Sequence, residues 1–472
     1  MTDIKERGDQ MEEACGVFGI YAQDESINVA EAAYYGLFAL QHRGQESAGI
    51  AVADGKGIKH YRNLGLVPEV FDEEILHGLT GRISIGHVRY STFGSKDVIN
   101  SQPLVARCKI GMLAVAHNGN LTNADRLRAE LIADNAVFQT TVDSEAIAML
   151  INKFSDGDIV RGVLKACECF KGSYALVVMT TDKLIAVRDP YGIRPLCVGK
   201  NMDDIVVASE SCALDAVGAN FLRDIEPGEV LVIDSAGMHS HRIAGRCKPA
   251  ACIFEYVYFS RPDSILDGCS VYETRMAAGR ILAENYPVEA DIVSGVPDSA
   301  IVAARGYSQV SGIPYVEALE KNRYVGRTFI QPDQKMREDS VSVKMNPLRA
   351  NIQGKRLVLI DDSIVRGTTS RRIVRMLKEA GAKEVHLRIC SPVIRHPCHL
   401  GIDMQSYSQL IGANKTEREI CEYIGADSLK YLTIDQLTES CKAAKIGFCL
   451  GCFDGKYPYS PEGEESGKFK FE

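Results

Sequence analysis

Residues 357–370 read LVLIDDSIVRGTTS: four apolar residues, two acids, and a short loop that ends in a glycine and three hydroxyl side chains. A short apolar run that is closed by polar residues is typical of a buried β-strand. The residues after the loop are compatible with a helix, and an earlier apolar run at 292–293 is followed by the same arrangement. This repeated order of strand, loop and helix predicts a parallel α/β sheet, in which ligands bind beyond the carboxyl ends of the strands.

The loop after the strand has the chemistry of a phosphate site. Backbone N–H groups at a helix N-terminus bind anions, and acidic side chains beside them suit ribose hydroxyls or Mg²⁺. The run resembles the signature of the type I phosphoribosyltransferases. The resemblance implies a phosphoribosyl diphosphate site formed by Asp361, Asp362, Ser363, Arg366, Gly367, Thr368, Thr369 and Ser370, with Asp361 and Asp362 toward magnesium. An ordinary strand-to-helix turn is the alternative.

Two further segments extend this predicted site. Residues 294–300 (SGVPDSA) resemble the diphosphate loop of the same family, with Ser299 as a further magnesium contact, although a simple turn is the alternative. Residues 321–329 (KNRYVGRTF) are basic in an otherwise acidic protein. They predict a lid whose Lys321, Arg323 and Arg327 close over the diphosphate and stabilise its charge. A solvated basic loop is the alternative.

The first half of the chain has a different pattern. Short apolar or alternating runs predict strands, and the stretches between them predict helices over 30–41, 126–133 and 144–153. The predicted fold is an α+β domain over 15–235, followed by the α/β domain with its parallel sheet over 250–455 and a tail over 456–472. Residues 1–14 form a polar leader with no apparent place in a core.

Cys15 follows this leader directly. If the leader is removed, Cys15 carries a free α-amino group with a pKa of about 7.7–8.0, which is a usable base beside the thiol. One residue then supplies both nucleophile and base. A structural cysteine at the start of a strand is the alternative on local grounds.

Four other runs accompany Cys15: QHRGQESAG at 41–49, GHVRYST at 86–92, HNGN at 117–120 and DSE at 143–145. Together they resemble the class II, N-terminal-nucleophile glutamine amidotransferases, whose fold is an αββα sandwich. The resemblance implies that Arg89 binds the glutamine carboxylate, Asp143 binds its ammonium, and Asn118 with the Gly119 N–H forms an oxyanion hole. Taken singly, an ion pair, a helix cap and a hairpin turn are the alternatives. We expect His87 and His117 to be structural.

The fifteen cysteines are not in a zinc-finger pattern, since the pair Cys449 and Cys452 has no second pair of the same spacing. With Cys252 and Cys398 they match the ligands of a 4Fe–4S cluster in one branch of the amidophosphoribosyltransferases. Zinc bound by four thiolates is the main alternative. We expect the other cysteines apart from Cys15 to be structural.

Composition excludes several classes of protein. The formal net charge of −8 disfavours nucleic-acid and anionic-membrane binding. The sequence shows neither a secretory signal nor an apolar stretch of the length that a bilayer requires, which predicts a cytoplasmic protein.

Both motif sets on one chain resemble the amidophosphoribosyltransferase family over nearly the whole length; the departures are a longer leader and Ala300 after the diphosphate loop. The resemblance implies a propeptide, the substrates glutamine and phosphoribosyl diphosphate, and the cofactors Mg²⁺ and a 4Fe–4S cluster. It also implies purine nucleotide inhibitors and a homo-oligomer, dimer or tetramer. Hexosamine-phosphate or asparagine synthases would not need the motif at 361–370. A non-enzymatic sensor of phosphoribosyl diphosphate would not need intact glutaminase residues.

Overall fold

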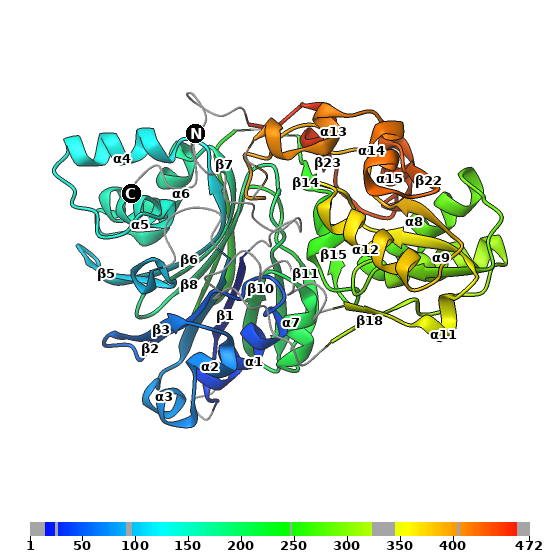
Figure 1. Cartoon of the computed structure of the whole chain (residues 1–472). Helices are drawn as coiled ribbons and strands as arrows, with labels where there is room; N and C mark the ends of the chain where they lie inside the picture. Colours follow the sequence, from blue (N-terminus) through cyan, green and yellow to red (C-terminus); the bar gives the residue numbers. More distant parts are fainter. Residues whose placement is uncertain are drawn as a thin grey trace.

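The computed structural model describes residues 15–23, 27–90, 97–245, 248–322, 345–402, 404 and 406–459 (Figure 1). The leader at 1–14 and two predicted lid residues, Arg323 and Arg327, lie outside the described residues. The described chain forms two halves that lie side by side, with the N-terminal half in blue to green and the C-terminal half in green to red.

The first sheet of the N-terminal half has seven antiparallel strands in the order β11-β9-β10-β1-β4-β2-β3. Their bounds are β1 Gly16–Tyr21, β2 Ser47–Ala53, β3 Ile58–Leu64, β4 Ile83–Arg89, β9 Cys197–Asn201, β10 Asp204–Ala208 and β11 Asn220–Asp224. Helices α1 (Val29–Ala39), α2 (Val67–Val70), α3 (Glu73–Gly78) and α7 (Ser211–Ala216) lie against this sheet, and Asn28 caps the first of them. Every residue of β1 is buried because the strand has a packed layer on both faces.

The second sheet has six strands in the order β13-β12-β8-β7-β6-β5. Their bounds are β5 Leu104–Cys108, β6 Gly111–Leu121, β7 Gly172–Met179, β8 Leu184–Arg188, β12 Glu229–Asp234 and β13 Gly237–Arg242. Helices α4 (Ala124–Ala133), α5 (Asp143–Ser155) and α6 (Ile159–Cys169) cover its outer face, and an apolar layer joins its inner face to the first sheet (Figure 1). The predicted αββα sandwich is confirmed. Strand β13 continues this sheet past residue 235, the predicted limit of the domain.

The C-terminal half contains a parallel sheet in the order β17-β20-β21-β22. The strands span Ile292–Gly295, Arg356–Asp361, Glu384–Ile389 and Ser428–Tyr431, and the main helices are α8 Val271–Asn285, α9 Ile301–Ser311, α12 Thr368–Glu379 and α14 Glu417–Ile424. One apolar core joins this sheet and its helices, as the predicted α/β pattern requires. The smaller elements are β14 Ala251–Cys252, β15 Ile265–Leu266, β16 Cys269–Ser270, β18 Leu319–Lys321, β19 Met345–Pro347, α11 Arg349–Ile352, α13 Ile411–Asn414, α15 Ile434–Ser440, β23 Phe448–Cys449 and α16 Gly451–Asp454.

The segment between the two halves pairs with a segment near the C-terminus. Strand β14 pairs in parallel with β23, and a π-helical turn, η2 (Glu255–Phe259), follows it. An apolar cluster around this turn includes residues of the 394–410 segment and of α16. The segment that contains β23 and α16 therefore packs against the junction of the two halves. No helix among the described residues is long and apolar enough to cross a bilayer.

Candidate functional site

Cys15 lies at the start of β1, where its backbone and thiol are both held. Its Sγ donates to the Tyr90 carbonyl at 3.3 Å, the Tyr90 N–H donates back to Sγ at 3.4 Å, and the Arg43 Nε donates to the Cys15 carbonyl at 3.0 Å. Burial raises the pKa of the Cys15 thiol, and the nearby Arg89 charge only partly offsets this. The thiol is therefore neutral at rest and needs a base to become a nucleophile.

Arg89 is the last residue of β4, and β4 pairs with β1 such that Val88 lies opposite Gly16. This register places the guanidinium beside Cys15 in a buried position. Burial lowers the pKa of Arg89, while the charges of Glu46, Cys15 and Asp143 oppose that effect. A buried guanidinium next to the thiol is suited to hold a carboxylate there.

Asp143 begins α5 and points toward the same site. Its Oδ2 accepts from the Leu121 N–H at 3.0 Å, and its Oδ1 lies 3.4 Å from the His117 Nδ1. Burial alone would raise the pKa of Asp143, but His117, the Leu121 N–H and Ser144 hold it below its ordinary value. The carboxylate stays charged and can accept from an ammonium group. His117 contacts the Asp143 carboxylate, whereas the Cys15 thiol forms its hydrogen bonds with Tyr90, which agrees with a structural role for His117.

Asn118 and Gly119 lie on β6, and Asn118 supplies a donor with no visible partner. The Asn118 Nδ2 is buried, and no described residue accepts a hydrogen bond from it. Gly119 has φ of +151°, and a Cβ there would lie 2.1 Å from the Ser173 carbonyl oxygen, so only glycine fits. A buried unpaired N–H donor is costly in a folded protein. Its presence here indicates a site for an acceptor atom of a ligand.

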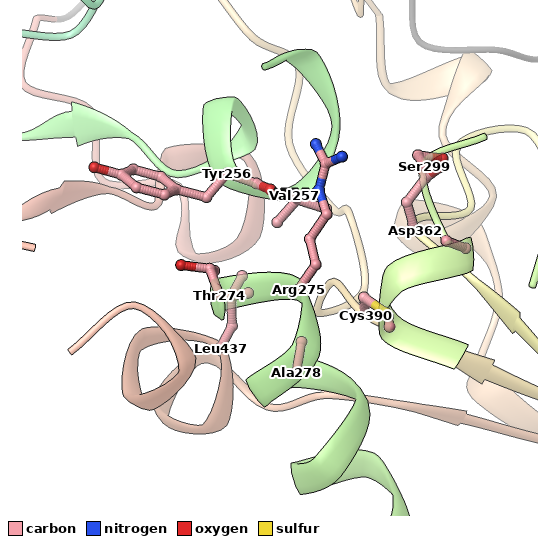
Figure 2. Close-up of a pocket in the computed structure, with 11 residues that line it drawn as sticks. Tyr256, Val257, Thr274, Arg275, Ala278, Ser299, Asp362, Cys390 and Leu437 are labelled. Carbon is pink, nitrogen blue, oxygen red and sulfur yellow. Dashed lines mark hydrogen bonds between the residues drawn. The ribbon is translucent and has the colours of Figure 1, made fainter. Parts of the chain in front are cut away.

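The second group of predicted residues meets at the carboxyl end of β20. Asp362 accepts a hydrogen bond from Ser299 and a second from the Ser363 Oγ at 2.6 Å, and its own N–H donates to Asp361 at 2.9 Å. Burial raises the pKa of Asp362 above its ordinary value. Figure 2 shows Ser299 and Asp362 side by side at one end of a pocket that Arg275 also lines. These acids and the Ser299 hydroxyl are the oxygen ligands that Mg²⁺ prefers.

The loop that follows turns into α12 at Gly367. Gly367 has φ of +80°, and a Cβ there would approach the Ile411 Cδ1 to 2.9 Å. Thr368, Thr369 and Ser370 form the first turn of α12, where backbone N–H groups have no partner within the helix. The structure therefore places the predicted loop residues 361–370 between the carboxyl end of β20 and the start of a twelve-residue helix, an arrangement that is suited to binding an anion.

Lys321 is the described part of the predicted lid. It ends β18 and forms an ion pair with Asp298, in the loop after β17. The side chain thus lies beside the predicted diphosphate loop. Both partners are exposed, so the pair itself adds little stability.

The four predicted cluster cysteines gather at the junction of the halves. Cys252 and Cys449 face each other in the pair β14–β23, and the charges of Cys398, Cys449 and Cys252 all act on Cys452. Burial raises the pKa of Cys449 to about 12 and that of Cys252 still higher. Among the described residues no three His, Cys, Asp or Glu side chains are grouped closely enough for a single metal ion.

Sequence reasoning missed two groups of buried charges. Arg43, Arg194, Glu210 and Glu255 form a network next to Cys15, and Arg275 lies beside Asp362. Arg43 stands within the run 41–49, which we singled out for another reason, and nothing in the sequence around Glu255 marked it. Arg275 lies in an ordinary helical stretch and was not marked either.

Comparison with known proteins identifies two domains. The family model of the glutamine amidotransferase domain matches residues 87–216, and that of the phosphoribosyl transferase domain matches residues 265–396. The chain is 53% identical to the amidophosphoribosyltransferase of Archaeoglobus fulgidus, over 96% of this chain and 99% of the relative. It is 48% identical to that of Bacillus subtilis, over 95% of this chain and 94% of the relative.

Two solved structures resemble the whole chain. One is described as glutamine phosphoribosylpyrophosphate amidotransferase from B. subtilis complexed with ADP and GMP, with a TM-score of 0.89, 46% identity, and coverage of 96% of this chain and 99% of that one. The other is described as the allosteric regulatory enzyme of purine biosynthesis, with a TM-score of 0.90, 46% identity, and coverage of 96% and 98%. Both likenesses cover the two halves together.

Proposed function

The chain belongs to the amidophosphoribosyltransferase family, and from that premise we propose how its residues perform the reaction. The enzyme converts phosphoribosyl diphosphate, glutamine and water to 5-phospho-β-D-ribosylamine, glutamate and diphosphate, the first committed step of purine biosynthesis. The N-terminal half releases ammonia from glutamine. The C-terminal half uses that ammonia to displace diphosphate.

In the N-terminal half, Arg89 holds the α-carboxylate of glutamine and Asp143 its α-ammonium. The free α-amino group of Cys15 takes the thiol proton, and Sγ attacks the side-chain amide carbon. Asn118 Nδ2 and the Gly119 N–H stabilise the oxyanion of the tetrahedral intermediate. The C–N bond then breaks, ammonia leaves with the returned proton, and water hydrolyses the thioester to glutamate. The buried, unpartnered Nδ2 of Asn118 is the observation that carries this proposal.

In the C-terminal half, the N–H groups and hydroxyls at 367–370 bind the 5-phosphate, and Asp361 and Asp362 contact the ribose hydroxyls. Ser363, Arg366 and Lys321 add donors and charge around the sugar phosphate and the diphosphate. Ammonia attacks C1 from the face opposite the diphosphate, so the C1–O bond breaks with inversion. Asp361, Asp362 and Ser299 would hold Mg²⁺, which neutralises the charge of the departing diphosphate. Arg323 and Arg327 are proposed to close over it from the lid.

We propose that Cys252, Cys398, Cys449 and Cys452 hold a 4Fe–4S cluster rather than zinc. Four thiolates on one zinc ion at about 2.3 Å would form a tight group, and the described residues contain no such group. In a cluster each thiolate binds a different iron, so the sulfurs stand further apart while still affecting one another's ionisation. All four side chains belong to one apolar cluster at the junction of the halves, which supports a common site for them. The cluster would stabilise the junction of the halves.

Further features of the enzyme are proposed on the same basis. Removal of residues 1–14 as a propeptide would supply the free amine that Cys15 needs. The pairing of β13 with β12 supports a glutaminase domain over 15–242, followed by the phosphoribosyltransferase domain over 250–455 and a tail over 456–472. Every described cysteine is free, which favours a reducing cytoplasm. ADP and GMP in the B. subtilis relative support purine nucleotide inhibitors, and assembly into a dimer or tetramer stays a prediction.

The test separates the two half-reactions. Cys15→Ala is expected to abolish product formation from glutamine and to leave product formation from ammonia intact. Intact mass of the purified protein reports in parallel whether the chain begins at Cys15 and, under native anaerobic conditions, whether iron and sulfide are bound. Equal loss of both activities, or a fully active enzyme that retains its leader, would contradict the mechanism.

A further inference from the structure

A buried network of four charges lies behind Cys15. The Arg43 Nη1 donates to Glu210 at 2.6 Å and to the Glu255 Oε2 at 2.9 Å, and its Nη2 donates to the Glu255 Oε1 at 2.9 Å. Arg194 donates to the same Oε1 at 3.0 Å. Two arginines and two glutamates therefore balance each other out of contact with water. Each nitrogen of the Arg43 guanidinium and each oxygen of the Glu255 carboxylate has a partner, which holds these two side chains in fixed positions.

Glu255 enters this network from the other half of the chain. It is the first residue of η2, beyond the last strand of the glutaminase sandwich. Among the described residues, the Glu255 carboxylate accepts three hydrogen bonds from guanidinium groups and a fourth from the Ser260 Oγ at 3.0 Å. Since Arg43 also donates to the Cys15 carbonyl, one arginine separates Glu255 from the nucleophile's backbone.

The same turn leads to the second site. The Arg275 Nε donates to the Tyr256 carbonyl at 2.9 Å, and its Nη2 donates to the Ser260 carbonyl at 2.8 Å. Figure 2 shows the Arg275 guanidinium between η2 and the side of the pocket where Ser299 and Asp362 lie. Burial lowers the pKa of Arg275, and the Asp362 charge opposes this effect. Residues 255–260 are thus bonded to Arg43 on one side and to Arg275 on the other.

We propose that Glu255 is a positioning residue for the glutaminase reaction, which fixes Cys15 through Arg43 although it lies outside the glutaminase domain. The inference rests on the proposed role of Cys15 as nucleophile. On this proposal, the junction of the halves helps to align the Cys15 thiol with the oxyanion hole. The same turn also reaches the second site, because the Ser260 carbonyl accepts a hydrogen bond from Arg275, and Arg275 lines the pocket that contains Asp362.

Glu255→Gln is the sharpest probe because it keeps the shape and removes the charge. One amide N–H₂ would then face an arginine donor, and the network would keep two arginines against one glutamate. Arg43 is then expected to move away from the amide N–H₂ of the new glutamine. Because it moves, the Cys15 carbonyl loses the hydrogen bond that the Arg43 Nε donates to it. A displacement of about 1 Å at a reacting group costs on the order of 10²-fold in rate.

The experiment measures alkylation of Cys15 by a chloroketone analogue of glutamine, in which Sγ displaces chloride from the analogue's reactive carbon. For Glu255→Gln we expect the maximal labelling rate to fall about 10- to 100-fold, with the half-saturating concentration unchanged because Arg89 and Asp143 still bind the analogue. Product formation from ammonia is expected to be unchanged. Ser260→Ala removes the hydroxyl group that donates to Glu255 and should give a smaller fall in the maximal labelling rate. This variant replaces Glu255→Gln in the test if Glu255→Gln folds poorly.

Asp267→Asn is the matched control. Asp267 forms a bidentate ion pair with Arg188 across the same junction, at 2.7 and 2.9 Å, and does not take part in the hydrogen bonds of Arg43 or Cys15. Its variant should label like the wild type. Wild-type labelling in Glu255→Gln, or equal losses in both variants together with loss of ammonia-dependent synthesis, would overturn the inference. A wild-type enzyme that fails to form product from glutamine would instead refute the proposed function.

Discussion

The Asn120 Nδ2 donates a hydrogen bond to the His399 carbonyl at 2.9 Å, which ties β6, the strand of the proposed oxyanion donors, to the loop after Cys398. The next residue in that loop, Leu400, accepts from the Ser173 Oγ on the neighbouring strand at 2.9 Å. Its N–H in turn donates to the Cys398 Sγ at 3.4 Å. The position of a predicted cluster ligand is therefore mechanically linked to β6 and β7.

Replacing that ligand should affect both stability and glutamine hydrolysis. Cys398→Ser is expected to lower iron content, to reduce Tm, and to lower the rate of glutamine hydrolysis because the loop at 398–400 loses its anchor. Iron analysis, thermal unfolding under anaerobic conditions and glutamate release check the three effects. Cys421→Ser, at a half-buried cysteine on α14, is the control and should keep iron content and activity. Normal iron content in Cys398→Ser would contradict the assignment.

Asn118→Ala removes the unpaired side-chain donor on β6. An oxyanion donor acts on the transition state more than on bound substrate, so kcat for glutamine hydrolysis should fall about 10²- to 10³-fold with little change in KM. Steady-state glutamate release checks this split. Ammonia-dependent synthesis in the same preparation should match the wild type. A rise in KM at constant kcat would assign Asn118 to substrate binding.

Arg89→Lys tests recognition of the glutamine carboxylate. Lysine keeps the charge but cannot donate two parallel hydrogen bonds, so KM for glutamine should rise by about tenfold or more. The measurement is the same glutamate assay, with the rate of Cys15 alkylation by iodoacetamide as a control for the thiol itself. An unchanged KM would show that the guanidinium geometry has no part in binding.

The common location of the proposed phosphoribosyl-binding residues was largely predictable because they are neighbours in sequence. Asp361 ends β20, Asp362 and Gly367 follow it within a few residues, and α12 begins directly after Gly367. The glutaminase residues come from four separate elements. Their residue types were recognisable in sequence, but their common location depends on the register of β1, β4 and β6, which only the folded sheets provide.

The charged network could not be predicted for the same physical reason. Arg43 and Glu255 become partners only when the two halves pack, and each residue alone has the appearance of a solvated charge. Arg275 belongs to a helix whose sequence gives no sign that its guanidinium is buried against the carbonyls of η2. Strand β13 was missed as part of the first domain because most of its side chains are exposed, so it lacks the apolar alternation that predicts a strand.

Asp224, at the end of β11, gives a prediction for pH dependence. Burial, together with the nearby charge of Asp267, raises the pKa of Asp224 to about 6, above its ordinary value of about 3.9. The folded state therefore binds this proton more tightly than the unfolded state. The contribution of Asp224 to stability is greatest below pH 4 and is lost as the pH rises toward and through 6.

Asp224→Asn removes this ionisation and should raise the free energy of unfolding at pH 7.5 by up to about 3 kcal/mol, since one pKa unit corresponds to about 1.4 kcal/mol. At pH 4.5 the variant and the wild type should differ much less. Denaturant unfolding at both pH values measures the difference. Asp215→Asn, at an exposed residue on the same half of the molecule, is the control for the loss of one negative charge. A destabilised Asp224→Asn at pH 7.5 would mean that the charged carboxylate is needed to hold Arg188 at the junction, and that its cost of burial is smaller than its attraction to the guanidinium.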